Sequence, residues 1–153
     1  MRLFLECKPD ETLALAPGVS PRAIVHGHGK GRVANYLAKR SGVTGLVDED
    51  PGSAEPISFR AHAEDSFAHD VRLRVNPAST NRLIVLCPRL EPWLIKTAKT
   101  CGIHMPEFGL SENLRDLDAE INDRLPNLQR FIRRLLDLKN ERLDRLQSLL
   151  ASI

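Results

Sequence analysis

The stretch GVTGLVDEDPG, residues 42–52, decides the fold that we expect for this chain. Its first half is a short apolar run, which stops abruptly in the acidic residues Asp48, Glu49 and Asp50 and a Pro-Gly pair. An apolar run bounded by turn residues is typical of a buried strand. We therefore expect the acidic group at the carboxyl end of a strand, where ligands bind in open α/β folds.

Similar short strands and helices alternate on both sides of this stretch. We expect strands over residues 2–7, 23–25, 42–47 and 81–87, and helices over residues 10–16, 32–40 and 91–101. Strands that alternate with helices indicate βαβ units. The expected fold class is therefore α/β, a Rossmann-like, mainly parallel sheet of about four strands flanked by helices. Within residues 54–80 only VRLRV, residues 71–75, alternates like an edge strand, and we assign the rest no structure.

From Ser111 onward the composition changes to Leu, Arg, Asp, Glu and Asn. A helix over residues 111–125 and a second from Pro126 to Ser152 are predicted by their apolar stripes. A helix of ~26 residues would span roughly 39 Å, longer than the small sheet, so part of it should project or find a partner. We accordingly divide the chain into an α/β domain, residues 1–108, and a C-terminal helical pair, residues 109–153, for packing or oligomerisation.

The acidic group can be interpreted in two ways. If the chain is still extended there, its period of two points Asp48 and Asp50 to the same side. Two converging carboxylates repel each other unless a cation lies between them, and Mg²⁺ or Mn²⁺ prefers such oxygen ligands. Glu6 ends another strand and could complete the site. The alternative is a solvated turn, because Asp, Pro and Gly are ordinary turn residues.

Three segments together resemble the Toprim domain of topoisomerases, primases and related nucleases. LFLECKPDETLAL (residues 3–15) is similar to its first motif, in which a strand delivers Glu6. IVHGHGKGRV (24–33) resembles its second strand and glycine-containing turn, and GLVDEDPGS (45–53) its DxD strand. The resemblance covers approximately the first 105 residues. Gly52 stands where many members have a further acidic residue.

The resemblance implies metal-assisted phosphoryl or nucleotidyl transfer on nucleic acid, as in a Mg²⁺-dependent nuclease. In that family the DxD aspartates, here Asp48 and Asp50, hold Mg²⁺ or Mn²⁺, and the glutamate, here Glu6, is a metal ligand or general acid/base. A metal between carboxylates can stabilise the charge that develops on a phosphodiester. Glu91 could supply a further carboxylate, or it could simply begin a helix.

The loop HGHGKGR, residues 26–32, is a candidate phosphate-binding segment. Its glycines free the backbone, and Lys30 and Arg32 precede or begin a helix whose N-terminal amides attract anions. We predict that His28, Lys30 and Arg32 bind phosphate, and that His26 or His28 could also reach a metal. The spacing is neither that of a Walker A loop nor GxGxxG. A flexible basic turn with solvated imidazoles is the alternative.

Charge and cysteine content set limits on the setting. The 22 basic and 20 acidic residues leave a net charge of +2, so any nucleic-acid binding must come from a local patch. The three cysteines are far apart, which is typical of reduced thiols and predicts a cytoplasmic protein. No apolar window is long enough for a membrane span, and the N-terminal apolar run is too short for a signal peptide.

Two other functions remain open at this point. A non-catalytic adaptor would use the Toprim-like core as a scaffold and its C-terminal helices to bind a second copy or a partner such as an ATPase. The arginines of these helices would form a solvated face or contact phosphates, and they are Arg124, Arg130, Arg133, Arg134, Arg142 and Arg145. A nucleotide-binding or phosphatase-like enzyme would instead depend on Lys30 in the glycine-rich loop.

Overall fold

The computed structural model describes residues 1–153 and contains a six-stranded mixed sheet. Its strands are β1 (Leu3–Leu5), β2 (Ile24–His26), β3 (Thr44–Asp48), β4 (Ala63–Ala68), β5 (Val71–Val75) and β6 (Arg82–Leu86). They are ordered β2-β1-β3-β6-β5-β4, with β2, β1, β3 and β6 parallel and β5 and β4 antiparallel to their neighbours. The predicted α/β class is confirmed, whereas a mainly parallel sheet of about four strands describes only part of the sheet.

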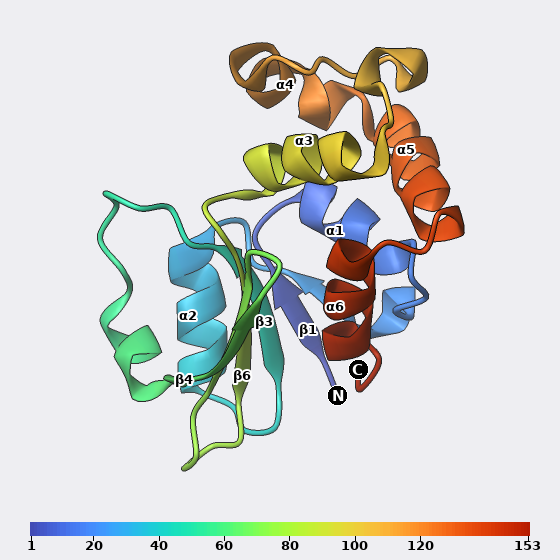
Figure 1. The fold of residues 1–153 in the computed structure, drawn as a ribbon. Coiled ribbons are helices and arrows are strands. Elements are labelled where there is room, and N and C mark those ends of the chain that lie inside the picture. The colour runs from blue at the N-terminus through green and yellow to red at the C-terminus, as the bar shows by residue number, and fades with distance from the viewer.

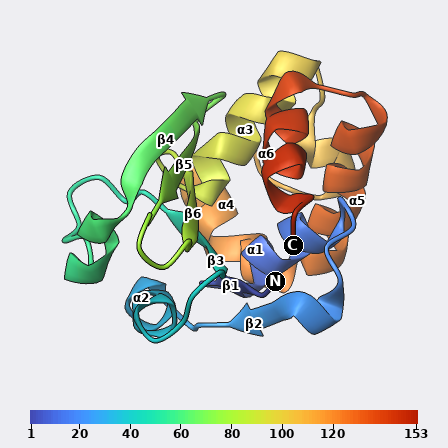
Figure 2. The same ribbon diagram turned by 90° about the horizontal axis from the view of Figure 1, so that it is seen from below.

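Helices cover both faces of the sheet (Figures 1 and 2). They are α1 (Lys8–Leu15), α2 (Lys30–Ala38), α3 (Leu90–Cys101), α4 (Leu114–Glu120), α5 (Leu125–Asp137) and α6 (Glu141–Leu150). On one face α2 packs through Val33 and Leu37 against Phe4 and Leu83. The other face is covered by α1, α3 and α6, which share one large cluster of buried side chains with the sheet and with α4 and α5.

The central strands are buried on both faces because their residues alternate between these two cores. In β3, Leu46 belongs to the α1 and α3 side and Val47 to the α2 side. Gly45 allows α2 to pack closely, since a Cβ there would lie 3.1 Å from side-chain atoms of both Val33 and Leu83. A near-continuous apolar run is what a doubly covered parallel strand requires. This explains why the strand could be predicted from residues 42–47.

The hairpin β4–β5 corrects the prediction for residues 54–80. VRLRV does form a strand, β5, but it is an interior strand that pairs with both β6 and β4. The outer strand β4 has the sequence AEDSFA and was not expected, because its mostly exposed residues show no apolar alternation. It is held by pairing to β5 through a turn at His69 and Asp70, both with positive φ. A short 3-10 turn, Ile57–Ala61, precedes it.

The predicted single helix from Pro126 to Ser152 is wrong. The chain breaks between α5 and α6 at Lys139, which has a φ of 49°, and Asn140, whose Oδ1 accepts a hydrogen bond from the Leu143 amide at 2.8 Å. Every predicted stripe leucine or isoleucine of this segment is buried. They are Leu128, Ile132, Leu135, Leu143, Leu146 and Leu150. The apolar sides of these helices are therefore used within the chain, and none of the segment has to project.

The C-terminal arginines divide into two groups. Arg142 is only 6% exposed, and its guanidinium donates to Asp70 Oδ2 and Thr97 Oγ1, both at 2.8 Å. Arg145 donates to Ser66 Oγ at 2.6 Å. These two fasten α6 to the sheet and to α3, whereas Arg124, Arg130, Arg133 and Arg134 are exposed. The interpretation as a solvated face is therefore wrong for Arg142.

The structure also bears on the predictions about the cysteines and about membrane spans. Cys7, Cys87 and Cys101 are all free thiols. None of the helices combines the length and apolar character that a membrane span requires.

Candidate functional site

The strand order places Glu6 and Asp48 on either side of a topological switch point. From β1 the chain crosses through α1 to β2 on one side, and from β2 it crosses through α2 to β3 on the other. The two crossover helices lie on opposite faces of the sheet (Figure 2). A crevice at the carboxyl ends of β1 and β3 is where ligands bind in such sheets. Glu6 directly follows β1, and Asp48 ends β3.

Glu6 and Asp48 are joined through a backbone hydrogen bond. The Asp48 amide donates to Glu6 Oε1 at 3.0 Å, so the glutamate turns toward the neighbouring strand. Burial raises the pKa of Glu6; the hydrogen bond and the charge of Lys30 act in the opposite direction, and Asp50 raises it further. The structure thus brings the Glu6 side chain to the backbone of Asp48.

Asp48 also caps a helix. Its Oδ1 accepts a hydrogen bond at 3.0 Å from the amide of Leu90, the first residue of α3. Burial raises the pKa of Asp48 to about 8, and the charges of Asp10, Glu6, Glu91 and Asp50 contribute in the same direction. A carboxyl that is protonated near neutral pH lacks a sufficient counter-charge.

Asp50 does not lie as the sequence predicted. The backbone is no longer extended at this residue, whose φ is 49°, so the strand period does not govern its direction. Its Oδ2 is 3.0 Å from Lys30 Nζ of α2, whereas Asp48 bonds to α3. The two aspartates thus engage different elements, and the expectation that they point to one side because the chain is extended is wrong.

Asp10 is an acidic neighbour that sequence reasoning missed. It is 2% exposed, and its Oδ2 accepts hydrogen bonds from the Cys7 amide at 3.2 Å and the Cys7 thiol at 3.1 Å. This arrangement closes the first turn of α1. Burial raises the pKa of Asp10 to about 7, with Glu6 and Glu91 adding to the rise. Burial also raises the pKa of the Cys7 thiol, which keeps it protonated.

Glu91 begins a helix, as one of the two sequence interpretations predicts, and it also lies among the other carboxyl groups. It lies in the first turn of α3, where a negative charge interacts favourably with the helix dipole. Burial raises its pKa, and the charges of Asp118 and Asp50 raise it further. Because Glu91 also acts on Asp10 and Asp48, it belongs to the same acidic group. We call Glu6, Asp10, Asp48, Asp50 and Glu91 the carboxylate cluster.

The carboxylate cluster has the donor chemistry of a divalent-metal site but is not arranged as one. No group of three or more His, Cys, Asp or Glu side chains lies close enough together to hold a metal ion. Glu6 and Asp48 instead accept hydrogen bonds from backbone amides, and Asp50 pairs with Lys30. Oxygen-only donors with raised pKa values fit Mg²⁺ or Mn²⁺. Binding would require these side chains to exchange their present partners.

The glycine-rich loop contributes one of its three predicted phosphate ligands to this edge. Lys30 donates to Asp50 Oδ2 at 3.0 Å and to the Glu49 carbonyl at 3.2 Å, while His28 and Arg32 are exposed. His26 lies 2.5 Å from Glu11 of α1, and its ring stacks with that of His28. Gly27 is required because a Cβ there would lie 2.7 Å from the Val33 side chain. The structure therefore brings Lys30, and not His28 or Arg32, to the acids.

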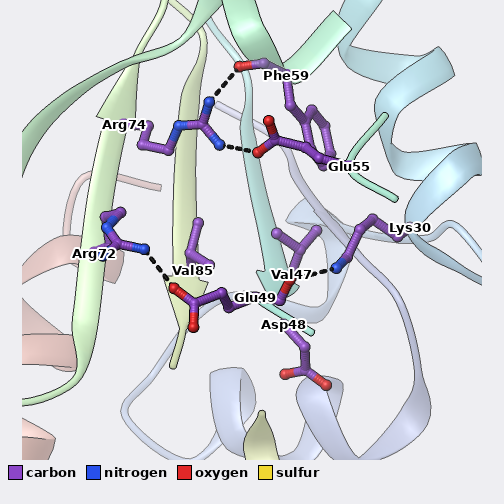
Figure 3. A pocket seen from close by; sticks show the side chains of 9 residues that line it. All are labelled: Lys30, Val47, Asp48, Glu49, Glu55, Phe59, Arg72, Arg74 and Val85. Atoms are coloured by element: carbon purple, nitrogen blue, oxygen red, sulfur yellow. Dashed lines mark hydrogen bonds and ion pairs between the residues drawn. The ribbon is translucent and has the colours of Figure 1, made fainter. Parts of the chain in front are cut away.

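A small pocket of about 60 Å³ adjoins the carboxylate cluster on the α2 side of the sheet. Its lining, drawn in Figure 3, includes Lys30, Glu49, Glu55, Arg72 and Arg74. Arg72 Nη1 donates to Glu49 Oε2 at 2.6 Å, and Arg74 pairs with Glu55. Glu55 was missed because it lies in the part of residues 54–80 that had no assigned structure, and Arg72 and Arg74 because VRLRV was assigned only as an edge strand, with no link to the acidic residues. The alternation of β5 was a usable signal, since it places Arg72 and Arg74 on one face.

The resemblance to the Toprim domain has no independent support from known proteins. Comparisons of the chain with protein-family models, with curated proteins and with solved structures find no match. Any function must therefore be argued from the carboxylate cluster and the pocket beside it.

Proposed function

We propose that this protein is a metal-dependent phosphoryl-transfer enzyme acting on nucleic acid, with a Toprim-like domain whose carboxylate cluster holds Mg²⁺ or Mn²⁺. One observation carries the proposal: at the switch point of the sheet, four carboxyl groups have pKa values raised mainly by burial. They are Glu6, Asp10, Asp48 and Glu91. Perturbed carboxyls concentrated at such an edge are typical of a functional site.

The charge balance supports a cation as the ligand. Lys30 is the one basic side chain that both bonds to a member of the carboxylate cluster and acts on the pKa of another, since it contacts Asp50 and lowers the pKa of Glu6. Asp48 and Asp10 have no basic partner. Buried carboxylates of this kind ionise when a metal ion supplies the missing positive charge.

The proposed roles follow from where each side chain lies. Glu6, Asp48 and Asp50 would hold the ion, which when bound polarises a phosphodiester and stabilises its developing charge. Glu6, whose pKa is raised by burial, can alternatively accept or deliver a proton. Lys30, which already bonds to Asp50, is positioned to contact a phosphate oxygen at the same edge.

Metal titration of wild-type protein and the Asp48→Asn variant tests the site. Calorimetry at pH 8 should show Mg²⁺ or Mn²⁺ binding to the wild type and at least about tenfold weaker binding to Asp48→Asn, because a ligand charge is lost. Asp137→Asn, which removes an exposed carboxylate of α5, is the matched control and should bind like the wild type. Identical binding to all three proteins would refute the site.

Cleavage assays then test the chemistry. Wild type with Mg²⁺ or Mn²⁺ should cleave at least one of single-stranded DNA, duplex DNA and RNA, and Asp48→Asn should lose at least about a hundredfold in rate. Metal binding without cleavage of any of these substrates would contradict the enzymatic part of the proposal but not the metal-binding part.

A further inference from the structure

We propose that the pocket beside the carboxylate cluster binds a phosphate group of the substrate, and that the Glu55 carboxylate occupies the position of this phosphate until it arrives. The assignment of the phosphate to a nucleic-acid strand rests on the proposed function, whereas anion binding by the pocket does not. We call this pocket, whose charged lining residues are Lys30, Asp48, Glu49, Glu55, Arg72 and Arg74, the arginine pocket.

Three cationic side chains from two distant parts of the chain converge on the arginine pocket. Lys30 comes from the start of α2, and Arg72 and Arg74 come from the same face of β5. Their side chains are 15%, 29% and 18% exposed. Partly buried cations arranged around one small space are the usual means of recognising phosphate oxygens.

Arg74 is held in place without help from Glu55. Its Nε donates to the His62 carbonyl at 2.9 Å, and its Nη2 donates to the Phe59 carbonyl at 2.8 Å. These two bonds fix the plane of the guanidinium and leave Nη1 facing the pocket (Figure 3). A guanidinium oriented in advance loses little entropy when it binds an anion.

Glu55 is the replaceable partner of this guanidinium. Its carboxylate pairs with Arg74 Nη1, makes no other hydrogen bond, and is 42% exposed. It lies on the surface segment between β3 and the 3-10 turn Ile57–Ala61. An ion pair exposed to this degree contributes little stability, so an incoming anion can displace it at small cost.

The size of the pocket selects the group that it can bind. A volume of about 60 Å³ holds on the order of four or five water molecules. This space matches a single tetrahedral anion and leaves no room for a nucleoside. The apolar part of the lining consists of Val47, Val85 and Phe59. The pocket therefore suits one phosphate whose attached groups remain outside.

The position of the pocket relates it to the carboxylate cluster. Glu49 lies between Asp48 and Asp50 in the sequence, and Lys30 both lines the pocket and bonds to Asp50. Asp48, a member of the carboxylate cluster, also lines the pocket, so the two sites adjoin at the end of β3 (Figure 3). A nucleic-acid strand bound across this edge of the sheet would place one phosphate in the arginine pocket and another at the carboxylate cluster.

NMR titration of the full chain tests the inference without metal or turnover. In the presence of EDTA, inorganic phosphate and a 5′-phosphorylated dinucleotide should both shift the Nε signals of Arg72 and Arg74. Glu55→Gln should bind both about fivefold more tightly, because it removes the competing charge, and Arg72→Gln about tenfold more weakly. Glu107→Gln removes one exposed carboxylate outside the pocket and should match the wild type.

The two ligands distinguish the sources of the phosphate. Tighter binding of the dinucleotide supports a nucleic-acid strand, and equal binding overturns the assignment to a strand while it supports an anion site. Thermal melting of each variant verifies folding. The inference is overturned if Glu55→Gln binds no more tightly than Glu107→Gln, or if neither ligand shifts the arginine signals. Either failure leaves metal binding by the carboxylate cluster intact.

Discussion

The carboxylate cluster and the arginine pocket adjoin at the end of β3, but their charges are balanced in opposite ways. On the α1 and α3 side, Asp10 is buried and Asp48 is half-buried, neither has a basic partner, and burial raises both pKa values. On the α2 side, each arginine of the arginine pocket is paired with at least one glutamate. The first side lacks a cation, whereas the second holds a carboxylate that an anion can replace. Two complementary halves of a phosphodiester site would differ in this way.

The largest expected effect concerns Asp10, on the acidic side. The stability contributed by its protonated form is complete below the unfolded-state pKa of about 3.9 and is lost as the pH rises to the folded value of about 7. In EDTA, the unfolding free energy of the wild type should therefore fall relative to Asp10→Asn by on the order of 3 kcal/mol between pH 4 and pH 7. Urea denaturation at several pH values measures this difference.

The control for this experiment is Asp137→Asn, whose stability should follow the wild type at every pH. Added Mg²⁺ should recover part of the loss above pH 7 in the wild type, because a bound cation favours the ionised carboxylates. If the unfolding free energies of wild type and Asp10→Asn change with pH in parallel, the Asp10 carboxyl is not the source of the pH dependence.

A smaller effect is expected from Arg74, on the basic side. Arg74→Met leaves the Phe59 and His62 carbonyls without their donor and should destabilise the protein by about 2 kcal/mol. Arg72→Met, which loses bonds to the half-exposed carboxylates of Glu49 and Glu64, should cost about 1 kcal/mol or less. Equal losses in the two variants, measured by urea denaturation, would contradict the view that the backbone carbonyls hold Arg74 more firmly than the carboxylates hold Arg72.

The smallest effect concerns His62, which is buried and has no hydrogen-bond partner for either ring nitrogen. Burial lowers its pKa, and the charge of Arg74 lowers it further, while Glu55 acts in the opposite direction. The stability of the neutral ring is present above the unfolded-state pKa of about 6.5 and is lost as the pH falls below it.

Hydrogen exchange of the amides of residues 57–62 reports this loss. After correction for the intrinsic rate, exchange in the wild type should accelerate between pH 7 and pH 5, by up to about fivefold. His62→Leu should remove the dependence, and His104→Gln, which changes an exposed imidazole, should retain it. An unchanged profile in His62→Leu would exclude the imidazole as the cause.

The positions of the candidate residues were predicted best where local sequence controls the backbone geometry. Glu6 and Asp48 were placed correctly because each ends a short apolar strand, and parallel strands present their carboxyl ends at one edge. Asp50 was misplaced because a single residue with positive φ ends the strand period. Asp10 was overlooked because its burial depends on α1 packing against the sheet, which no local pattern reports.

The sequence by itself determined the alternation of strands and helices, the α/β class and the chemistry available at the ends of β1 and β3. These properties depend on periodicity and turn residues, which act over a few neighbours. Only the tertiary structure decided that α6 turns back onto the sheet, that β4 extends it, and that Lys30 meets Arg72 and Arg74 in one pocket. The contacts of α6 with the sheet and of Lys30 with the two arginines join residues more than 40 positions apart, so they depend on strand order and packing rather than on local pattern.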